Sequence, residues 1–472
     1  MSVFAVLGLV LGLIAEPASA SRFIPVDSIQ VNGPGLIVTV VDEEAVLKGA
    51  RVWIESAEGA LLTAGATGPD GNFTSALSPE VLAKGVSVTA YAPGFAPVTF
   101  LENISNRVRI ELPRILPATY PIISGQLTGF DDEDGIGRAQ VGIVAKALGI
   151  ADLGQLDSSA FVSPINDTIP VYGSREIPSN IILPDQWFML GIIPVHVNKP
   201  SYRLPVLPGS SDRYLALSGN VAAAQVLRAL RDNVSEQMLD FLNVTRVGIS
   251  EPVKVGLTDN RTRAMTVVNV EANERLTGHL DFKGSGYQNG KDIKHLVGAL
   301  WEPFPGTFVP TDVKFTDGQG VRLKTIPAKQ TRVLDLVVTA DGYKFRGQWL
   351  DPEKGSIPKS TLSADFVFEG LDKPWSLSTT DTFHLMVAHV QNAFETSLGA
   401  QRADDKWVVV SPFRARIKLP GNAFNDLRST LGKVNVVSVD LLQTRSGGYP
   451  FVQGEDAARD LSVMEKVIKE IK

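Results

Sequence analysis

The sequence contains no cysteine, and this absence excludes several kinds of site at once. Disulfide bonds, thiolate metal centres and a cysteine nucleophile all require a thiol. A basic excess is also lacking, because 45 Lys and Arg stand against 51 Asp and Glu and leave a formal net charge of −6. Proteins that bind nucleic acid usually have the opposite balance, since they must neutralise phosphates. We therefore expect no nucleic-acid partner.

Long apolar stretches are lacking as well. The run Val3–Ala15 is the most apolar segment near the start of the chain. A helix of that length, at about 1.5 Å per residue, falls short of a hydrocarbon core of ~30 Å. No later stretch reaches the length of a membrane span. We therefore expect no transmembrane anchor.

The first twenty residues have the pattern of an export signal. An apolar run is followed by Ala18-Ser19-Ala20, a small-x-small site of the kind that signal peptidase cleaves. This predicts a signal peptide over residues 1–20, an N-terminal segment over 21–35, and a secreted or periplasmic protein, with the cell surface as one such location. Export without disulfides is more typical of bacteria than of animals. Because no Lys or Arg precedes the run, an upstream start and an ordinary buried segment are the alternatives.

Turn-forming residues are abundant, with 42 Gly and 29 Pro, which favours a β protein over a helical bundle. Short β-branched runs are separated by turn signals from residue 36 onward, and the turn Thr67–Phe73 combines Pro69 with Gly71. Strands of this length and spacing predict a small antiparallel β-sandwich over residues 36–113. The runs are Leu36–Val41, Ala50–Ile54, Val86–Tyr91 and Val108–Leu112.

This region resembles the carboxypeptidase regulatory-like domain, a transthyretin-like family. The resemblance is carried by Asp42 after the first strand, Gly49-Ala50-Arg51-Val52, the T-G-P-D-G-N-F turn and the later V-T-A-Y-A-P-G-F segment. The sequence departs from the family at Gly68, where Asp is common, and at Phe95, where Tyr is commoner. The resemblance implies a non-catalytic module of the kind attached to exported enzymes, receptors and adhesins. It implies no site residues.

The rest of the chain continues the β pattern with accessory helices. We expect a second β-rich domain over 114–262 with a helix near 222–242, a third β-rich domain over 263–420, and a C-terminal segment over 421–472. That last segment is predicted to end in an amphipathic helix whose apolar stripe is Leu461, Met464, Ile468 and Ile471. The fold class is therefore mainly β, with tandem antiparallel β-sandwich-like domains and a few helices. A charged turn, Arg402–Lys406, is expected between two strands of the third domain.

Motifs for catalysis and cofactors are missing. The sequence has no His-Glu-x-x-His and no Gly-rich phosphate loop, and Gly284-Ser285-Gly286 lacks the spacing of a nucleophile elbow. His384 and His389 lie five residues apart, and we expect structural roles for both. We therefore predict no catalytic or cofactor-binding residues, and no enzyme. A hydrolase built from dispersed residues is an alternative, and it requires one of the five histidines beside Ser and Asp or Glu.

Four consecutive acids, Asp131-Asp132-Glu133-Asp134, precede Gly135. Hard oxygen ligands followed by glycine suit calcium, so Asp131, Asp132 and Asp134 are candidate ligands. An EF-hand, however, requires a closing Glu where this chain has Gly142. A solvated hairpin tip is the competing interpretation of the same residues.

Tryptophan is concentrated in the last third of the chain, at Trp301, Trp349, Trp375 and Trp407. Exposed rings on a sheet face would bind sugars, whereas buried rings would form core. From these features we predict a non-catalytic binding or scaffold protein of the bacterial cell envelope, in an adhesive role, with an envelope protein or polysaccharide as partner. A carbohydrate-binding protein is the alternative, and it requires two or more exposed Trp or Tyr on one face.

Overall fold

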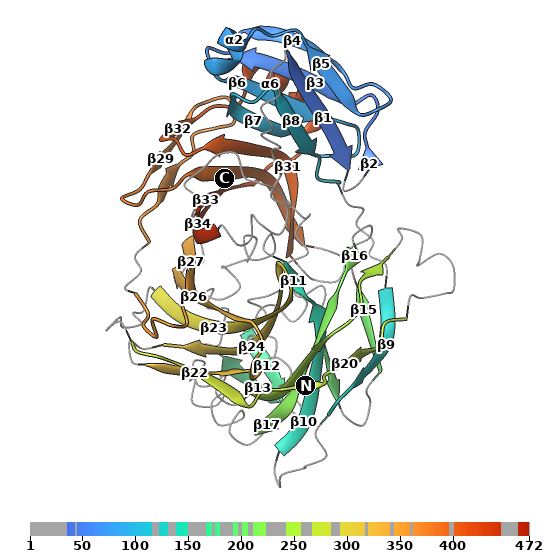
Figure 1. The fold of residues 1–472 in the computed structure, drawn as a ribbon, viewed down its shortest axis with the longest axis vertical. Helices are drawn as coiled ribbons and strands as arrows, with labels where there is room; N and C mark the ends of the chain where they lie inside the picture. Colours follow the sequence, from blue (N-terminus) through green and yellow to red (C-terminus); the bar gives the residue numbers. More distant parts are fainter. Residues whose placement is uncertain are drawn as a thin grey trace. The chain divides into compact units, whose positions relative to one another are not determined.

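A computed structural model describes seventeen stretches of the chain in two compact units. One unit contains the described residues within 117–361 and 395–401, and the other those within 18–116, 362–394 and 402–472. Both consist mostly of β-strands (Figure 1), so the prediction of a mainly β fold is confirmed. The described stretches are 35–42, 45–115, 122–130, 138–149, 167–171, 175–179, 192–196, 201–205, 211–222, 242–255, 267–284, 293–316, 320–339, 344–358, 362–395, 401–444 and 461–471.

The first unit is built from several sheets. One has the order β14-β10-β17-β18-β21, and another contains the run β11-β24-β23-β26-β27. Its strands are β9 (Ile122–Thr128), β10 (Arg138–Lys146), β11 (Leu148–Gly149), β12 (Asp167–Val171), β13 (Arg175–Ser179), β14 (Ile192–His196), β15 (Ser201–Pro205), β16 (Ser211–Asp212), β17 (Tyr214–Ala222), β18 (Leu242–Ile249), β19 (Val253–Lys254), β20 (Val270–Glu271), β21 (Glu274–Arg275), β22 (Gly278–Phe282), β23 (Ile293–Phe304), β24 (Thr307–Phe315), β25 (Val321–Thr325), β26 (Thr331–Thr339) and β27 (Lys344–Leu350).

Alternation of side chains explains how these strands bury a core. In β25, Val321 and Leu323 are buried whereas Arg322 is exposed. Successive residues of a strand point to opposite faces, so one face of β25 packs inward and the other meets water. Phe282 and Val297 belong to the same apolar cluster as the inward face of β25.

The second unit combines both ends of the described chain. Its two larger sheets have the orders β5-β1-β8 and β4-β3-β6-β7-β31-β30-β33-β34. Its elements are β1 (Leu36–Asp42), β2 (Ala45–Val46), β3 (Arg51–Ser56), β4 (Leu61–Ala66), β5 (Asn72–Ser75), α2 (Pro79–Ala83), β6 (Val86–Tyr91), β7 (Val98–Asn103), β8 (Arg107–Glu111), β28 (Asp365–Val367), β29 (Trp375–Ser378), β30 (Leu385–Glu395), β31 (Gln401–Pro412), β32 (Arg416–Ile417), α6 (Gly421–Leu427), η3 (Arg428–Thr430), β33 (Val436–Thr444) and β34 (Leu461–Glu470).

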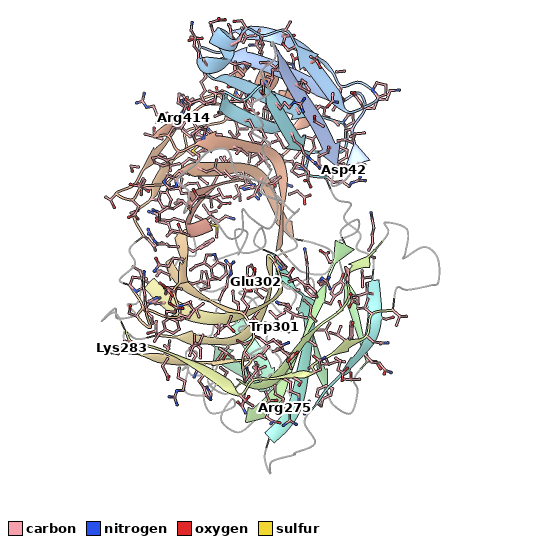
Figure 2. All side chains as sticks on the ribbon, in the orientation of Figure 1. Asp42, Arg275, Lys283, Trp301, Glu302 and Arg414 are labelled. Carbon is pink, nitrogen blue, oxygen red and sulfur yellow. The ribbon has the colours of Figure 1, made fainter. Side chains whose placement is uncertain are left out.

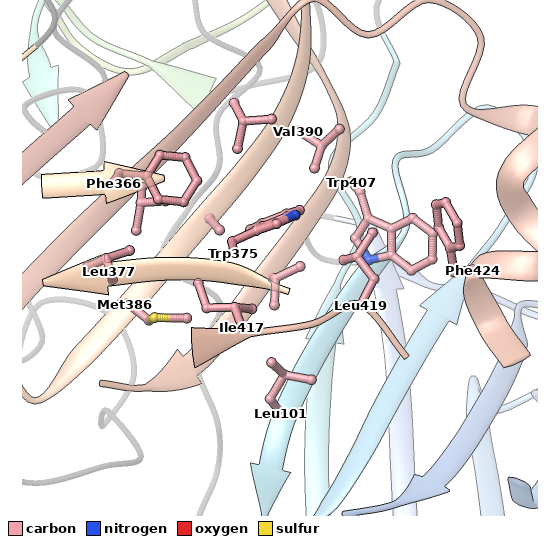
Figure 3. Close-up of a cluster of buried hydrophobic side chains, with 14 of the residues drawn as sticks. Leu101, Phe366, Trp375, Leu377, Met386, Val390, Trp407, Ile417, Leu419 and Phe424 are labelled. Atoms are coloured by element: carbon pink, nitrogen blue, oxygen red, sulfur yellow. The ribbon is translucent and has the colours of Figure 1, made fainter. Parts of the chain in front are cut away.

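The N-terminal strands and the C-terminal strands of this unit share one sheet and one core. β7 pairs with β31 in parallel, with Val98 opposite Val408. The indole Nε1 of Trp407 donates to Thr99 Oγ1 at 2.9 Å. Leu101 of β7 lies in the same apolar cluster as Trp407 (Figure 3). Residues 36–112 therefore pack as part of a larger unit.

The turn predicted around Pro69 and Gly71 is present between β4 and β5. Gly71 has φ +73°, and a Cβ there would lie 2.7 Å from the Cβ of Val46. Glycine meets both conditions because it has no Cβ. The Oδ1 atom of Asp70 accepts from the Asn72 N–H at 3.1 Å, which closes the turn.

The amphipathic helix predicted at the C-terminus is wrong, because Leu461–Glu470 is the strand β34. It pairs with β33 along its length, from Val436 opposite Glu470 to Thr444 opposite Leu461. Pairing with β33 outweighs the local helical spacing of apolar residues. The helix expected near 222–242 falls on 223–241, outside the described residues. In the described part of the chain, no helix has the length and apolar character needed to cross a membrane.

Candidate functional site

The strands β30, β31, β33 and β34 bring together a cluster of charged side chains: His389, Asp405, Asp440 and Lys466. Asp440 lies opposite Lys466 on the neighbouring strand, and His389 lies two residue pairs further along β30. Side chains of opposite charge on adjacent strands stabilise a sheet when they meet on one face. All four residues are at least nine-tenths buried.

Both nitrogens of the His389 imidazole face carboxylates. Nδ1 lies 3.2 Å from Asp405 Oδ1, and Nε2 lies 3.4 Å from Asp440 Oδ2. Lys466 Nζ approaches Asp440 from the other side, at 3.8 Å from Oδ1. Burial favours the neutral imidazole, but the two carboxylates outweigh burial and raise the pKa of His389 to about 9. At neutral pH the His389 imidazole is therefore protonated.

This geometry removes His389 as a general base. A catalytic histidine needs a free ring nitrogen near neutral pH to take a proton from a nucleophile. Here both ring nitrogens donate to carboxylates, and the raised pKa keeps both protons in place. Ser438 is the cross-strand neighbour of His389, yet its buried Oγ has no hydrogen-bond partner among the described residues. The cluster holds strands together and lacks the arrangement of a triad.

A second buried imidazole has a similar role in the first unit. His295 of β23 contacts Asp335 of β26 through Nε2, and both side chains are almost fully buried. Gln348 of β27 donates to the other carboxylate oxygen, Asp335 Oδ2, at 2.7 Å. The three strands are neighbours in one sheet, so the network crosses the strands at mid-sheet.

The structure describes the side chains of two further histidines, His279 and His384. Half-buried His384 interacts through Nδ1 with Thr444, whose backbone N–H donates to it at 3.1 Å. His279 is exposed on β22. The side chain of His196 lies outside the described part. The structural roles expected for His384 and His389 agree with these contacts.

The charged residues Arg402–Lys406 belong to a strand and not to a turn. The charged turn expected at Arg402–Lys406 is wrong, because these residues lie within β31 and Asp405 is buried. Sequence reasoning therefore missed Asp405 as a partner of His389.

The tryptophans form core: Trp301, Trp375 and Trp407 are buried, and Trp349 is half-buried. No Trp or Tyr side chain in the described stretches is exposed.

The proposed calcium ligands Asp131, Asp132 and Asp134 lie outside the described residues. The same is true of the predicted signal peptide and of Ser285. Within the part of the chain that the structure covers, no group of three or more His, Asp or Glu has the geometry of a metal site.

Comparisons with known proteins place the chain in no family. No family's sequence pattern matches it, and no curated protein matches it either. Solved structures with weak similarity include the Bacillus anthracis TIE protein, at 10% identity and a TM-score of 0.14, covering 82% of this chain and 51% of that one. Others are a putative adhesin from Bacteroides ovatus (12%, TM-score 0.12, covering 42% and 77%) and BcpA, the major pilin subunit of Bacillus cereus (11%, TM-score 0.13, covering 65% and 86%). The chain spans about half the length of the TIE protein. Similarity at this level carries no argument about function.

Proposed function

We propose that this chain is a non-catalytic binding or scaffold protein of the bacterial cell envelope, exported and adhesive. The observation that carries the proposal is the environment of His389, whose two ring nitrogens are held by Asp405 and Asp440 inside a sheet. A buried imidazolium between two carboxylates stabilises a fold and cannot act as a base. The same use of a buried imidazole recurs at His295 and Asp335.

The export and the module assignment belong to the same proposal. Export rests on the apolar run and Ala18-Ser19-Ala20 at the start of the chain. The assignment of residues 36–113 as a carboxypeptidase regulatory-like domain rests on the motif order. Two features of this region support it, namely the turn at Gly71 and the short strands of β1 to β8.

Buried aromatic rings disfavour the carbohydrate-binding alternative. That alternative requires rings on an exposed sheet face, where they stack on sugars. Trp375 and Trp407 are instead fully buried in the apolar cluster of the second unit. The partner that we favour is therefore an envelope protein rather than a polysaccharide.

A paired assay tests the proposal. The purified chain is mixed with isolated bacterial envelopes, either untreated or stripped of protein by protease, and sedimented. We expect the chain to sediment with untreated envelopes and to remain in solution with stripped ones. In parallel, chromogenic ester, amide and glycoside substrates are offered to the wild type and to Ser438→Ala. Turnover by the wild type that Ser438→Ala loses would refute the non-catalytic role, and equal sedimentation with stripped envelopes would refute a protein partner.

A further inference from the structure

The strand β4 forms an open edge of the second unit's larger sheet. Among the described residues, β3 is the only strand that pairs with β4. The pairing is antiparallel, with Arg51 opposite Ala66 and Trp53 opposite Ala64. In Figure 1 the hairpin of β3 and β4 lies among the blue N-terminal strands.

The ladder between β3 and β4 determines which backbone groups face outward. The Thr67 N–H donates to the Ala50 carbonyl at 2.9 Å just beyond the strand. In an antiparallel ladder, hydrogen-bonded and non-hydrogen-bonded pairs alternate. The next pair, Ala66 with Arg51, is therefore non-bonded, as is Ala64 with Trp53. The N–H and C=O groups of Ala64 and Ala66 consequently point away from β3.

From Thr63 to Ala66 the edge lacks charge and proline, two of the usual protections against pairing, and the one register shift of the ladder lies before this stretch, at Leu62. Soluble proteins normally guard edge strands with charges, proline or bulges that twist the edge away. The eleven residues from Gly59 to Pro69 contain no charge. Leu61 and Leu62 are 48% and 37% exposed, and Ala64 and Ala66 are exposed as well. By contrast β8, which pairs with β1 in the other sheet, carries charged side chains at Arg107, Arg109 and Glu111.

Turns at both ends hold the edge in a fixed position. At the start, Gly59 has φ +87° and its N–H donates to the Ser56 carbonyl at 2.9 Å. At the end, the Gly68 N–H donates to the Asn72 carbonyl at 2.8 Å. A pre-formed strand loses little conformational entropy when it pairs, so binding at this edge costs less than binding of a flexible loop.

We propose that β4 pairs with β4 of a second copy of this chain, in an antiparallel, two-fold symmetric dimer. A register centred on Gly65 places Ala64 of each copy opposite Ala66 of the other. All four outward groups of Ala64 and Ala66 are then satisfied in both copies. Self-pairing sets each side chain against a copy of a near neighbour, so an edge with charges of one sign would repel itself. The absence of charge from residue 59 to residue 69 is therefore what favours a second copy as the occupant.

The dimer is small, because one pair of strands buries less than a standard interface. Its population should therefore depend on concentration. Sedimentation equilibrium of the full chain over a concentration series measures this directly. We expect a monomer–dimer equilibrium and slower amide hydrogen exchange in β4 at high concentration.

Charge substitutions on the edge give the decisive test. The double variant Ala64→Lys with Ala66→Lys places lysine opposite lysine and should raise the dissociation constant about tenfold or more. The double variant Ala64→Glu with Ala66→Glu should do the same. An equimolar mixture of the two should dimerise again, because unlike charges then face each other. Ile104→Lys, at a loop position that is 62% exposed, is the matched control and should dimerise as the wild type does.

Thermal unfolding of each variant confirms that the variants fold. A chain that stays monomeric at every concentration would overturn the inference, as would a dimer that the lysine pair leaves intact. Loss of the dimer in Ile104→Lys, or oligomers that keep growing with concentration, would also overturn it. The inference concerns assembly and does not depend on the envelope-binding and turnover assays above.

Discussion

Several charged side chains of this chain are buried within its sheets and hydrogen-bonded there. Glu302 of β23 is buried, and its carboxylate accepts from the Gly306 N–H, from Gln330 Nε2 and from Arg332 Nε at 2.7–2.9 Å. The Arg332 guanidinium also stacks over Trp349, 5.3 Å from the ring centre. Figure 2 labels Glu302 and its strand neighbour Trp301. A buried carboxylate is tolerated here because several donors replace its lost water.

The charge on His389 makes the stability of the fold depend on pH. Its pKa is raised from 6.5 to about 9 in the folded chain. Between these values the folded state holds a proton that the unfolded state lacks, so stability falls as pH rises. The contribution of His389 to the free energy of unfolding is fully present below pH 6.5 and is lost as the pH approaches 9. The change is on the order of 3 kcal/mol. Urea unfolding of the full chain at pH 6 and at pH 9 measures it.

His389→Gln separates this effect from the titration of other groups. The substitution leaves Asp405 and Asp440 without the cation between them, and should lower the free energy of unfolding at pH 6 by about 3 kcal/mol. The decrease in the free energy of unfolding between pH 6.5 and pH 9 should become smaller in this variant. An unchanged slope in the variant would show that another group causes the pH dependence.

At the scale of elements, β34 shows how a strand can have the sequence pattern of a helix. The helical interpretation leaves Glu465 and Lys466 in water, whereas the strand buries both. The Glu465 carboxylate accepts from the Ala364 N–H at 2.6 Å. The position of Glu465 therefore distinguishes the two interpretations.

Glu465→Gln should destabilise the chain if β34 is the strand described. An amide can accept one hydrogen bond but cannot replace a buried carboxylate, and the expected loss is about 1–3 kcal/mol. Lys469→Gln, at an exposed position of the same strand, is the control and should leave the unfolding midpoint unchanged. Equal midpoints for the two variants would indicate that position 465 faces solvent.

The short helix α6 is attached to β3 by a buried carboxylate. Glu55 Oε1 accepts from the Ala423 N–H at 3.0 Å, and Oε2 accepts from the Asn422 N–H at 3.3 Å. These are two of the amide groups that a helix N-terminus leaves without intrahelical partners.

Glu55→Gln should therefore loosen α6. We expect a loss of about 1–3 kcal/mol and faster amide hydrogen exchange over residues 421–427, measured by mass spectrometry. Glu58→Gln, on the exposed hairpin between β3 and β4, should leave that exchange as in the wild type. Unchanged exchange in both variants would mean that other contacts hold the helix.

At the scale of the whole molecule, the second unit is discontinuous in sequence. Its first part, residues 36–112, gives Trp53 and Leu101 to an apolar cluster formed mostly by residues beyond 362. The edge of β7 pairs with β31 from that later part. Each part therefore covers apolar surface of the other.

This arrangement predicts that residues 36–113 are incomplete when expressed alone. Without β31 and α6, the apolar surface around Trp53 and Leu101 is exposed to water. We expect the fragment to bind a hydrophobic dye. We also expect its strands to unfold at a lower urea concentration than the same strands in the full chain, with unfolding measured in both by amide hydrogen exchange. A fragment that binds no dye and matches the full chain in urea would show that the module folds independently.

The features of the fold that could be predicted from the sequence depend on local residue patterns. The turn at Gly71 and the mainly β class follow from neighbouring residues, because alternation and turn chemistry act over a few positions. The burial of Asp405 and Glu465 was not predictable, since both lie in charged stretches that are typical of surface turns and helices. Their partners come from other segments of the chain, His389 from β30 and Ala364 from the residue before β28. The four-residue cluster around His389 likewise depends on strand neighbours that no spacing in the sequence reveals.

The sequence by itself determined the fold class, the lack of thiol chemistry, and the turn at Gly71. Tertiary structure alone decided that the last strand joins a sheet, that the charged residues of β31 turn inward, and that the first and last parts of the chain share one core. The physical reason is the sequence separation over which each kind of interaction acts. Propensity and alternation act between near neighbours, whereas strand order and burial depend on contacts between residues hundreds of positions apart, such as Thr99 and Trp407.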